Sequence, residues 1–403
     1  MICGLLGQGL GHSYSPAIHA LLGDYEYTLI EKEPTQIEEF LHQGNFDGLN
    51  VTMPYKKTVL PYLDQQTETA KKLGAVNTII RRSDHSLLGH NSDYFGFLYM
   101  IRRSGLTVAG KKCLVLGSGG ASNTAMAVLR ELNACPMVIS RAGENNYSNL
   151  HLNADAQIIV NTTPVGMYPY CGNSPIDLSA FPKLEGVLDV VYNPARTKLL
   201  LDAEARGLNT ANGLWMLVAQ AAESSHYFTG HPISHAKIEE VYEKIRYRME
   251  NIVLIGMPGC GKSTIGAALA EHLSRPFVDI DQEIERAAGK TIPAIFAEDG
   301  EAAFRQLETQ VLRHFGQESG LVIATGGGCV TRKENYDLLH QNGHILWLRR
   351  ALSTLETKGR PLSIDLHSMY AQRKSLYESF ADRCIDNNGT IENTLVQILE
   401  EKP

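Results

Sequence analysis

A glycine-rich segment in the second half of the chain constrains the fold more than any other feature. Residues 256–264 read GMPGCGKST and match the phosphate-loop pattern G-x-x-x-x-G-K-[ST]. An apolar run at residues 252–255 precedes this loop and a helical pattern at residues 265–273 follows it, as the motif requires. Glycines let backbone N–H groups turn toward phosphate oxygens, and the N-terminus of the next helix adds a positive dipole end. The pattern therefore predicts a nucleotide-binding module of the kinase or NTPase type that begins near residue 250.

Residues in and after this loop have the chemistry for phosphate and Mg²⁺. The motif predicts that Lys262 reaches the β- and γ-phosphates of a nucleotide and that Ser263 holds Mg²⁺. A predicted strand at residues 276–281 ends in Asp279 and Asp281, which would share one face of that strand. We expect Asp279 to hold Mg²⁺ through water and Asp281 to bind a substrate hydroxyl. The alternative is that these acids cap the next helix.

Composition limits the class of protein and its partners. The 403 residues suffice for two or three domains, and a formal net charge of −7 argues against nucleic acid as the main partner. No apolar run approaches the length of a membrane span, and the N-terminus does not resemble a signal peptide. The seven cysteines form no C-x-x-C pair, so we expect reduced thiols, no zinc site and a cytoplasmic location. Small molecules are the expected partners, and both a monomer and a homodimer remain open.

Polar side chains gather at predicted strand ends and loops in the first hundred or so residues. This set comprises Ser13, Ser15, Asn50, Thr52, Lys56, Asn77 and Asp93. Each has an ordinary alternative: Ser13, Ser15 and Asp93 could cap helices, and Lys56 could be a solvated surface charge. As a set, these residues are typical of a site for a polar ligand with several hydroxyls.

The motifs S-x-S-P, N-V-T-x-P-x-K and G-A-V-N-T occur here in this order, and together they resemble the substrate domain of shikimate dehydrogenases. The resemblance implies that Lys56 and Asp93 form the catalytic pair. The family reads N-T-D where this chain has Asn91-Ser92-Asp93, and Ser92 keeps the hydroxyl. The resemblance also implies that shikimate contacts Ser13, Ser15, Asn50, Thr52, Lys56, Asn77, Asp93 and Gln220.

A second glycine cluster predicts a dinucleotide-binding module. Residues 117–122 read GSGGAS, between a predicted strand at residues 111–116 and a predicted helix at residues 123–132. The next predicted strand ends at Ser140-Arg141 and has no acid there to bind a ribose 2′-hydroxyl, so Arg141 indicates the 2′-phosphate of NADP. The alternative for Arg141 is a solvated charge. By resemblance, Tyr192, Gly213 and Met216 lie at the nicotinamide end of the cofactor. The full set expected to bind NADP is Gly117, Gly119, Gly120, Ala121, Ser140, Arg141, Tyr192, Gly213 and Met216.

The stretch after Arg141 is short. The resembling family commonly places a helix, a strand and another helix before the segment that corresponds here to residues 158–160. We therefore expect a trimmed Rossmann-like module that lacks about a helix and a strand, with the cost falling on the stability of the sheet edge.

The C-terminal motifs resemble shikimate kinase. The phosphate loop, D-x-D at residues 279–281, F-R-x-x-E at residues 304–308 and T-G-G-G at residues 325–328 follow in order. The resemblance implies that Arg305 and Arg373 bind the shikimate carboxylate, which suits bidentate guanidinium recognition. It also places Asp281 and a backbone contact of Gly327 at shikimate. The lid from Arg360 to Arg373 is shorter than usual. The ATP-binding residues implied are Gly259, Gly261, Lys262, Ser263, Thr264 and Arg360.

The sequence thus predicts an α/β chain with three modules. They are a substrate domain at residues 1–104 with 213–248, a trimmed Rossmann-like NADP domain at 105–212, and a P-loop domain of the nucleoside-monophosphate-kinase type at 249–403. The expected activities are NADPH-dependent reduction of 3-dehydroshikimate and ATP- and Mg²⁺-dependent phosphorylation of shikimate, two steps toward chorismate and the aromatic amino acids.

Three alternatives stay open. The first half could act on quinate, although the small side chain of Ser13 favours shikimate. The chain could be a metabolite-sensing regulator, although Lys56, Asp93 and Lys262 are all present. One half could also be inactive, and the trimmed module makes the first half the candidate.

Overall fold

The computed structural model describes residues 1–11, 13–355 and 366–400, which form two compact units. Unit 1 comprises Met1–Val165, Ser174–Tyr192 and Leu199–Ile245. Unit 2 comprises Gly166–Asn173, Asn193–Lys198 and Arg246–Pro403. Three sheets flanked by helices confirm the predicted α/β class.

The first sheet of unit 1 has six strands in the order β2-β1-β3-β5-β6-β4, and β5 runs antiparallel to both β3 and β6. Its strands are β1 Ile2–Gly7, β2 Glu26–Glu31, β3 Gly48–Val51, β4 Gln65–Gln66, β5 Thr78–Arg81 and β6 Leu87–His90. The helices of this part are α1 Ser15–Leu22, η1 Pro34–Gln36, α2 Ile37–Gln43, η2 Leu60–Tyr62, α3 Glu68–Leu73, α4 Asp93–Arg103 and α7 Leu214–Thr229. Ile37 and Leu41 of α2 pack with Leu49 of β3 in one buried cluster, so the apolar stripe of α2 covers the sheet.

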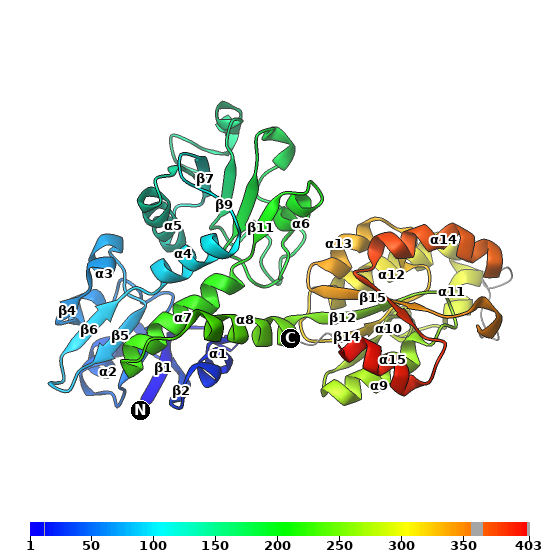
Figure 1. The fold of residues 1–403 in the computed structure, drawn as a ribbon, viewed down its shortest axis with the longest axis horizontal. Coiled ribbons are helices and arrows are strands. Elements are labelled where there is room, and N and C mark those ends of the chain that lie inside the picture. The colour runs from blue at the N-terminus through cyan, green and yellow to red at the C-terminus, as the bar shows by residue number, and fades with distance from the viewer. Residues whose placement is uncertain (12, 356–365, 401–403) are drawn as a thin grey trace. The chain divides into compact units, whose positions relative to one another are not determined.

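The second sheet of unit 1 is the one expected to bind a dinucleotide. Its five parallel strands follow the order β11-β10-β9-β7-β8. They are β7 Lys112–Leu116, β8 Cys135–Ile139, β9 Ile158–Asn161, β10 Gly186–Asp189 and β11 Asn209–Ala211, with helices α5 Gly120–Glu131, η4 Leu178–Ala180 and α6 Lys198–Glu204. Cys113 and Val115 of β7 pack in the same cluster as α5, whereas Leu114 and Leu116 pack in the cluster with α6. Alternate side chains of one strand therefore face two helical layers, and Figure 1 shows α5 and α6 on either side of the sheet.

The predicted trimming of this module is confirmed. Between β8 and β9 the chain forms a single 3-10 segment, η3 Tyr147–Asn153. As a result, β8 is an edge strand of the described sheet. Pro136 lies within β8, and proline suits an edge because it has no backbone N–H to donate to a further strand.

Unit 2 contains a parallel five-stranded sheet in the order β13-β14-β12-β15-β16. Its strands are β12 Asn251–Ile255, β13 Phe277–Asp279, β14 Val322–Ala324, β15 Gly343–Arg349 and β16 Arg383–Asp386. Its helices are α9 Lys262–Leu273, α10 Ile280–Ala288, α11 Ile292–Glu298, α12 Gly300–Gly316, η5 Cys329–Thr331, α13 Glu334–His340, η6 Leu352–Thr354, α14 Leu366–Phe380 and α15 Ile391–Leu399. Figure 1 shows α9 and α15 on one side of the sheet and α13 and α14 on the other.

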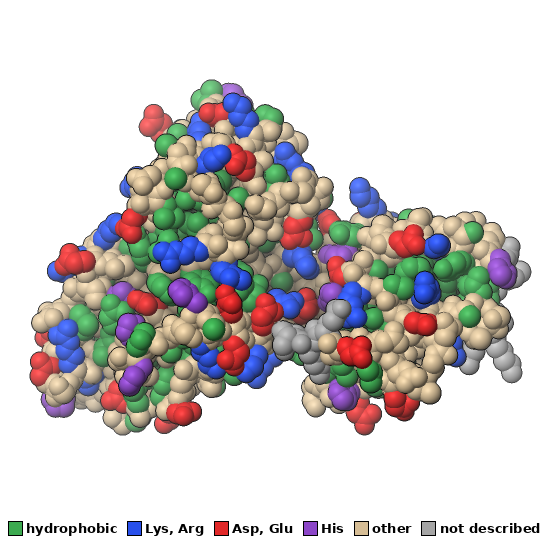
Figure 2. Space-filling model, viewed as in Figure 1, with side chains coloured by type: hydrophobic (Ala, Val, Ile, Leu, Met, Phe, Trp, Pro, Cys, Tyr) green, Lys and Arg blue, Asp and Glu red, His purple; other side chains and the backbone are tan. Residues whose placement is uncertain are grey.

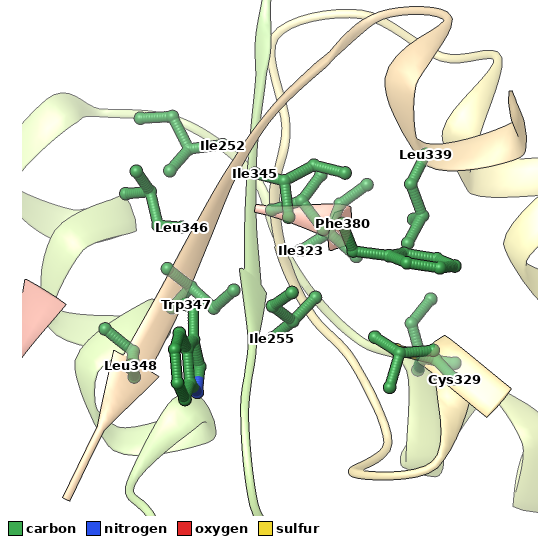
Figure 3. Packing of buried hydrophobic residues seen from close by; sticks show 14 of the residues in the cluster. Ile252, Ile255, Ile323, Cys329, Leu339, Ile345, Leu346, Trp347, Leu348 and Phe380 are labelled. Carbon is green, nitrogen blue, oxygen red and sulfur yellow. The ribbon is translucent and has the colours of Figure 1, made fainter. Parts of the chain in front are cut away.

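The core of unit 2 is built on β12 and β15, which are buried on both faces. In Figure 3, Leu346 and Leu348 of β15 point away from Ile345 and Phe380. Trp347 lies on the α14 side, where its ring stacks on Tyr377 at a centroid distance of 5.7 Å. Burial of both faces fixes the carboxyl end of β15 in space, and the loop residues that follow it start from a rigid position.

Helix α8 His235–Met249 leads into β12 with one residue between them. Met249 is 3% exposed and Asn251 is completely buried, so both residues are packed inside the protein. In unit 2, Arg275 donates hydrogen bonds to the carbonyl oxygens of Tyr247 and Glu250, and Gly320 N–H donates to Met249 O at 2.8 Å. The last turn of α8 therefore packs as part of unit 2.

Unit 2 also includes two short segments that precede α8 in the sequence, Gly166–Asn173 and Asn193–Lys198. The backbone N–H of Ala195 donates to Asn342 Oδ1 at 2.7 Å, and that of Arg196 donates to Gln341 O at 2.8 Å. These backbone bonds hold the second segment against the turn between α13 and β15.

The surface in view carries charges of both signs. Figure 2 shows Lys and Arg side chains interspersed with Asp and Glu side chains rather than segregated into a basic face. Among the helices of the described residues, none has both the length and the apolar content needed to cross a bilayer.

Candidate active sites

Lys56 and Asp93 meet in unit 1. Lys56 follows β3, Asp93 is the first residue of α4, and Lys56 Nζ lies 2.5 Å from Asp93 Oδ2. Their side chains are 30% and 17% exposed, so the pair is shielded from water on most sides. Tyr55, 1% exposed, anchors the loop beside Lys56, and Val76 N–H donates to Lys56 O at 2.9 Å. The result is a positioned ammonium that can donate a proton to a ligand.

Asn50 and Asn77 lie in a buried polar network next to this pair. Asn50 Nδ2 donates to Ser224 Oγ at 2.8 Å, and Asn50 Oδ1 accepts from the Tyr27 hydroxyl at 2.8 Å. Asn77 Oδ1 accepts from Ser92 N–H at 2.7 Å. The two asparagines are only 5% and 3% exposed. Protein partners thus occupy both amide atoms of Asn50, and its expected contact with shikimate stays a prediction.

Ser224 is a member of this network that the sequence interpretation missed. Its hydroxyl lies 2.9 Å from Thr78 Oγ1 and 3.0 Å from Ser92 Oγ, and Ser92 Oγ donates to Gln220 Oε1 at 3.2 Å. The structure thereby brings Gln220 into the same group as Asn77. Ser224 follows Gln220 by four residues on α7, a spacing that puts both on one helix face and could have identified it.

Ser13, Ser15 and Thr52 lie where β1 and β3 end. These strands are parallel neighbours, so the loops after them share one edge of the sheet. Ser13 Oγ accepts from Ser15 N–H at 3.2 Å, which is the local bond expected of a hydroxyl at a helix start. Thr52 N–H donates to Leu6 O at 2.9 Å. The roles of these three residues in ligand binding stay predictions. Their position at this edge of the sheet is suited to such roles.

The glycine loop after β7 fits a dinucleotide. A Cβ added at Gly119 or Gly120 would meet no atom within 4 Å, and α5 begins at Gly120. Gly117 has φ +109°, a conformation that favours glycine. Open space over backbone N–H groups at a helix N-terminus suits a pyrophosphate, with Ala121 in the first turn.

Arg141 follows β8 and is exposed. Within the described parts of the chain it has no ion-pair partner. Burial raises the pKa of the Tyr147 phenol, and the positive charge of Arg141 acts in the opposite direction, which places the two groups near each other. Ser140 N–H donates to Asn145 O at 3.2 Å and closes the turn after the strand. The guanidinium is therefore available for an anion.

One of the residues expected at the nicotinamide end, Tyr192, lies near the loop that carries Ser13 and Ser15. The rings of Tyr192 and Tyr14 contact edge to face at a centroid distance of 6.3 Å, and Tyr14 stands between Ser13 and Ser15. A Cβ at Gly213 would lie 1.9 Å from Val190 O, so glycine is required there. Met216 packs against α4, where a Cβ at Gly96 would lie 2.6 Å from Met216 O.

In unit 2 the phosphate loop forms between β12 and α9 as expected. Gly256, Gly259 and Gly261 all have positive φ angles, at +145°, +80° and +95°. Lys262 begins α9 and is 8% exposed; its Nζ donates to Gly256 O at 2.9 Å and to Met257 O at 3.0 Å. The ammonium thus lies over the loop, while Ser263 and Thr264 occupy the first turn of the helix.

The expected placement of the two acids is wrong in one respect. The strand ends at Asp279, and Asp281 lies in the first turn of α10, so they do not share a strand face. Asp279 caps α10, because its Oδ1 accepts from Asp281 N–H at 3.0 Å, while its Oδ2 accepts from Ser263 Oγ at 2.6 Å. Ser263 and Asp279 therefore present adjacent oxygens beside the phosphate loop, which fits Mg²⁺.

A cavity of about 400 Å³ opens beside the phosphate loop. Its walls bring together the phosphate loop, the loop after β14, and residues from α10, α11, α12 and α14. Among the predicted residues, it is lined by Gly259, Gly261, Lys262, Ser263, Thr264, Asp281, Arg305, Gly327 and Arg373. Arg360 lies outside the described residues.

The cavity wall on α12 carries a buried ion pair. Arg305 Nη1 donates to Glu308 Oε2 at 2.8 Å, and Glu308 is completely buried. Burial raises the pKa of Glu308, the Arg305 charge lowers it, and the negative charge of Asp281 raises it again. Glu308 Oε1 has no hydrogen-bond partner among the described residues. Arg305 Nε and Nη2 also donate to Glu301 Oε1 at 3.3 and 3.2 Å. All three guanidinium nitrogens thus have protein partners, and the expected contact of Arg305 with shikimate stays a prediction.

Gly327 lies between the phosphate loop and α14. Its carbonyl oxygen accepts from the Tyr377 hydroxyl at 2.5 Å and from Arg373 Nη1 at 3.2 Å. A Cβ at Gly327 would lie 2.6 Å from Pro258 Cδ, so only glycine allows this approach. Because its carbonyl is engaged, the predicted backbone contact of Gly327 would use its N–H. A further lining residue, Arg350, was not foreseen from the sequence.

Comparison with known proteins agrees with this geometry. The family described as "Shikimate dehydrogenase substrate binding domain" matches residues 5–79, and the family described as "Shikimate kinase" matches residues 258–402. A shikimate dehydrogenase (NADP(+)) of Clostridium perfringens is 34% identical over 267 residues, which cover 61% of this chain and 98% of that relative.

Two solved structures extend the comparison. A chorismate mutase/shikimate 5-dehydrogenase fusion protein from Clostridium acetobutylicum matches with TM-score 0.57 and 35% identity, covering 60% of this chain and 96% of that one. A quinate dehydrogenase from Corynebacterium glutamicum, in complex with NAD, matches with TM-score 0.56 and 29% identity, covering 60% and 99%. The chain therefore belongs to the shikimate dehydrogenase family over its N-terminal part and carries a shikimate kinase domain over residues 258–402.

Proposed function

We propose that this chain catalyses two consecutive reactions, the NADPH-dependent reduction of 3-dehydroshikimate to shikimate and the ATP-dependent phosphorylation of shikimate to shikimate 3-phosphate. The observation that supports the proposal is that each unit brings several of the predicted polar residues together. Unit 1 holds the Lys56–Asp93 pair, and unit 2 holds a phosphate loop facing Arg305 and Arg373 in one cavity. Both sites suit the same small hydroxy-carboxylate.

In the reduction, the bound cofactor supplies the hydride that attacks the ketone carbon. The oxygen of that ketone gains negative charge and needs a proton. Lys56 is placed to donate the proton, and Asp93, 2.5 Å from the ammonium nitrogen, orients it. Asn77, Ser92 and Gln220 are joined by hydrogen bonds, so they hold the polar wall beside this pair in a fixed arrangement.

In the phosphorylation, the chain positions two anions and neutralises charge. Arg305 and Arg373 suit the acceptor carboxylate, since a guanidinium binds a carboxylate through two parallel bonds. Lys262 and the N-terminus of α9 suit the phosphate chain of ATP. Mg²⁺, held by Ser263 and Asp279, would neutralise charge on the phosphates. Asp281 lines the same cavity and can accept a hydrogen bond from the attacking hydroxyl.

A coupled assay tests the proposal. The purified full chain is incubated with 3-dehydroshikimate and NADPH, then with MgATP, and shikimate and its 3-phosphate are quantified by mass spectrometry. We expect oxidation of NADPH with formation of shikimate, followed by conversion to the phosphate. If 3-dehydroshikimate is not reduced, the dehydrogenase half acts on another substrate or is inactive. If shikimate is not phosphorylated, the same conclusion holds for the kinase half.

Quinate is the second candidate substrate of unit 1, because a quinate dehydrogenase is among the similar structures. Oxidation of shikimate and of quinate is compared with NADP⁺ and with NAD⁺. A higher kcat/KM for shikimate with NADP⁺ supports the proposed activity, and Arg141 is the observation that favours this cofactor. The seven free cysteines fit a reducing compartment, and we propose a cytoplasmic location on that ground.

A further inference from the structure

Arg350 is a cavity-lining residue on the side opposite the acceptor-binding groups. It comes directly after β15, and β15 and β14 lie on either side of β12, the strand that leads into the phosphate loop. The carboxyl ends of parallel strands meet at one edge of the sheet. The end of β14 leads to Gly326–Gly328 beside Arg305, whereas the end of β15 leads to Arg350. Arg350 therefore flanks the phosphate loop from the other side.

The guanidinium of Arg350 lies close to the phosphate loop. Its Nη1 is 3.8 Å from the position that a Cβ on Gly261 would occupy. Gly261 directly precedes Lys262, where α9 begins and where backbone N–H groups face the site. An anion seated on this end of the loop would be within reach of the guanidinium.

The backbone around Arg350 is fixed to the phosphate loop through the chain that follows β16. Asn387 N–H donates to Arg349 O at 2.8 Å, and Ala351 N–H donates to Asn388 Oδ1 at 2.8 Å. Asn387 Nδ2 also donates to Cys260 O at 2.6 Å. Asn387 thus connects the end of β15 to the phosphate loop. Figure 3 shows the packed side chains that anchor β15.

The side chain of Arg350 has no polar partner within the described structure. No hydrogen bond or ion pair joins its side chain to any residue within 1–11, 13–355 and 366–400. An arginine has five N–H donors and no acceptor, and its charge persists at every physiological pH. A guanidinium that lines a cavity beside Lys262 and the N-terminus of α9 has its complement in a polyanion.

We propose that Arg350 binds the phosphate chain of ATP and neutralises part of its charge. The inference rests on the proposed kinase function and adds a nucleotide-binding residue to it. The acceptor carboxylate is assigned to Arg305 and Arg373 across the cavity, so Arg350 acts on the nucleotide and not on shikimate.

The test compares Arg350→Ala and Arg350→Lys with a matched control, Arg349→Ala. Arg349 is the preceding residue, is exposed and does not line the cavity. We measure the Kd of MgATP by isothermal titration calorimetry and the KM values of MgATP and shikimate in the full chain. A charge-assisted bond to phosphate predicts that Arg350→Ala weakens MgATP binding about tenfold or more. Arg350→Lys should recover part of the loss, and Arg349→Ala should stay within about twofold of wild type.

Two results would overturn the inference. One is an unchanged MgATP Kd in Arg350→Ala, and the other is a rise in the KM of shikimate without a change for MgATP. Unit 1 activity and the thermal unfolding midpoint report whether each variant is folded, and Arg350→Lys gives a second reading if the alanine variant is not. If the wild-type chain binds MgATP but does not phosphorylate shikimate, the proposed function fails while the MgATP titrations still decide the role of Arg350.

Discussion

The ammonium nitrogen of Lys56 lies 2.5 Å from a carboxylate oxygen of Asp93, in a pair that is mostly shielded from water. Lys56 comes from the loop after β3 and Asp93 from the start of α4, so two distant parts of the sequence supply one proton-donating group. The carboxylate fixes the position of the ammonium, as the proposed part of the pair in ketone reduction requires.

Replacing Lys56 with Met should abolish most of the reduction of 3-dehydroshikimate. The loss of a positioned general acid predicts a fall in kcat of roughly 10²- to 10⁴-fold, measured by NADPH absorbance. Binding of NADPH, followed by its fluorescence, should stay close to wild type because the glycine loop after β7 is untouched. The control is Lys57→Met, which removes the same charge from the exposed neighbouring residue. Comparable turnover in both variants would contradict the assignment.

Replacing Lys262 with Met should abolish phosphorylation and leave reduction unchanged. Its ammonium lies over the carbonyl oxygens of Gly256 and Met257, where it would meet the transferred phosphoryl group, and loss of such a charge predicts at least about a 100-fold fall in rate. Lys333→Met, at an exposed position of unit 2, is the control. If Lys262→Met lost both activities while remaining folded, the two sites would not be independent.

Two glycines of the cofactor module should respond in opposite ways to substitution by alanine. Gly119→Ala places a methyl group where no atom lies within 4 Å, so the thermal midpoint should hold while the KM of NADPH rises. Gly213→Ala places a methyl group 1.9 Å from Val190 O, so the protein itself should be destabilised, by about 1–3 kcal/mol or more. Thermal unfolding and NADPH kinetics on both variants check this. A loss of stability in Gly119→Ala would show that the space over the loop serves the fold and not a ligand.

The buried histidine of α1 should make unit 1 less stable in mild acid. His19 is completely buried, its Nδ1 lies 2.6 Å from the Tyr25 hydroxyl, and burial lowers its pKa to about 3. The unfolded chain, with a histidine pKa near 6.5, binds a proton that the folded chain does not. The stabilisation is therefore complete above about pH 6.5, and below it the unfolding free energy should fall by up to ~1.4 kcal/mol per pH unit.

Urea unfolding at about pH 5 and about pH 7 measures this slope. The chain has two tryptophans, and a Trp347→Phe background leaves Trp215 as the fluorescent reporter of unit 1. His19→Gln should reduce the difference between the two pH values, whatever it does to absolute stability. His42→Gln, at an exposed site of the same unit, should leave the difference unchanged. Equal slopes in wild type and His19→Gln would rule out His19 as the source.

Local patterns predicted the fold well where one motif fixes its own geometry. The glycines of the phosphate loop need positive φ angles, so β12, the loop and α9 follow directly from the sequence. The short stretch after Arg141 likewise predicted the loss of elements between β8 and β9. In both cases, the residues that decide the structure are neighbours in sequence.

The sequence was less informative where residues distant in the chain determine the local structure or the contacts of a side chain. Strand alternation predicts that the strand reaches Asp281, whereas it ends at Asp279, and the bond from Asp281 N–H to Asp279 Oδ1 caps the helix that begins there. Asn50 seemed free to bind a ligand, since its partners Tyr27 and Ser224 come from other elements. Arg350 carries no motif, and its place in the cavity depends on the strand order of the sheet. Such contacts are set by tertiary packing and not by local spacing.

The end of α8 has a consequence for anyone who wishes to dissect the two activities genetically. A kinase fragment that starts at Asn251 would keep every residue of the sheet but would lose the carbonyl groups of Tyr247, Met249 and Glu250, which accept hydrogen bonds from Arg275 and Gly320. Arg275 would then keep its charge without these acceptors. A start before Arg246, a helical turn earlier, would keep the whole continuous part of unit 2, although not the earlier segments Gly166–Asn173 and Asn193–Lys198. A kinase fragment cut at β12 would therefore be less stable than the kinase half is in the full chain.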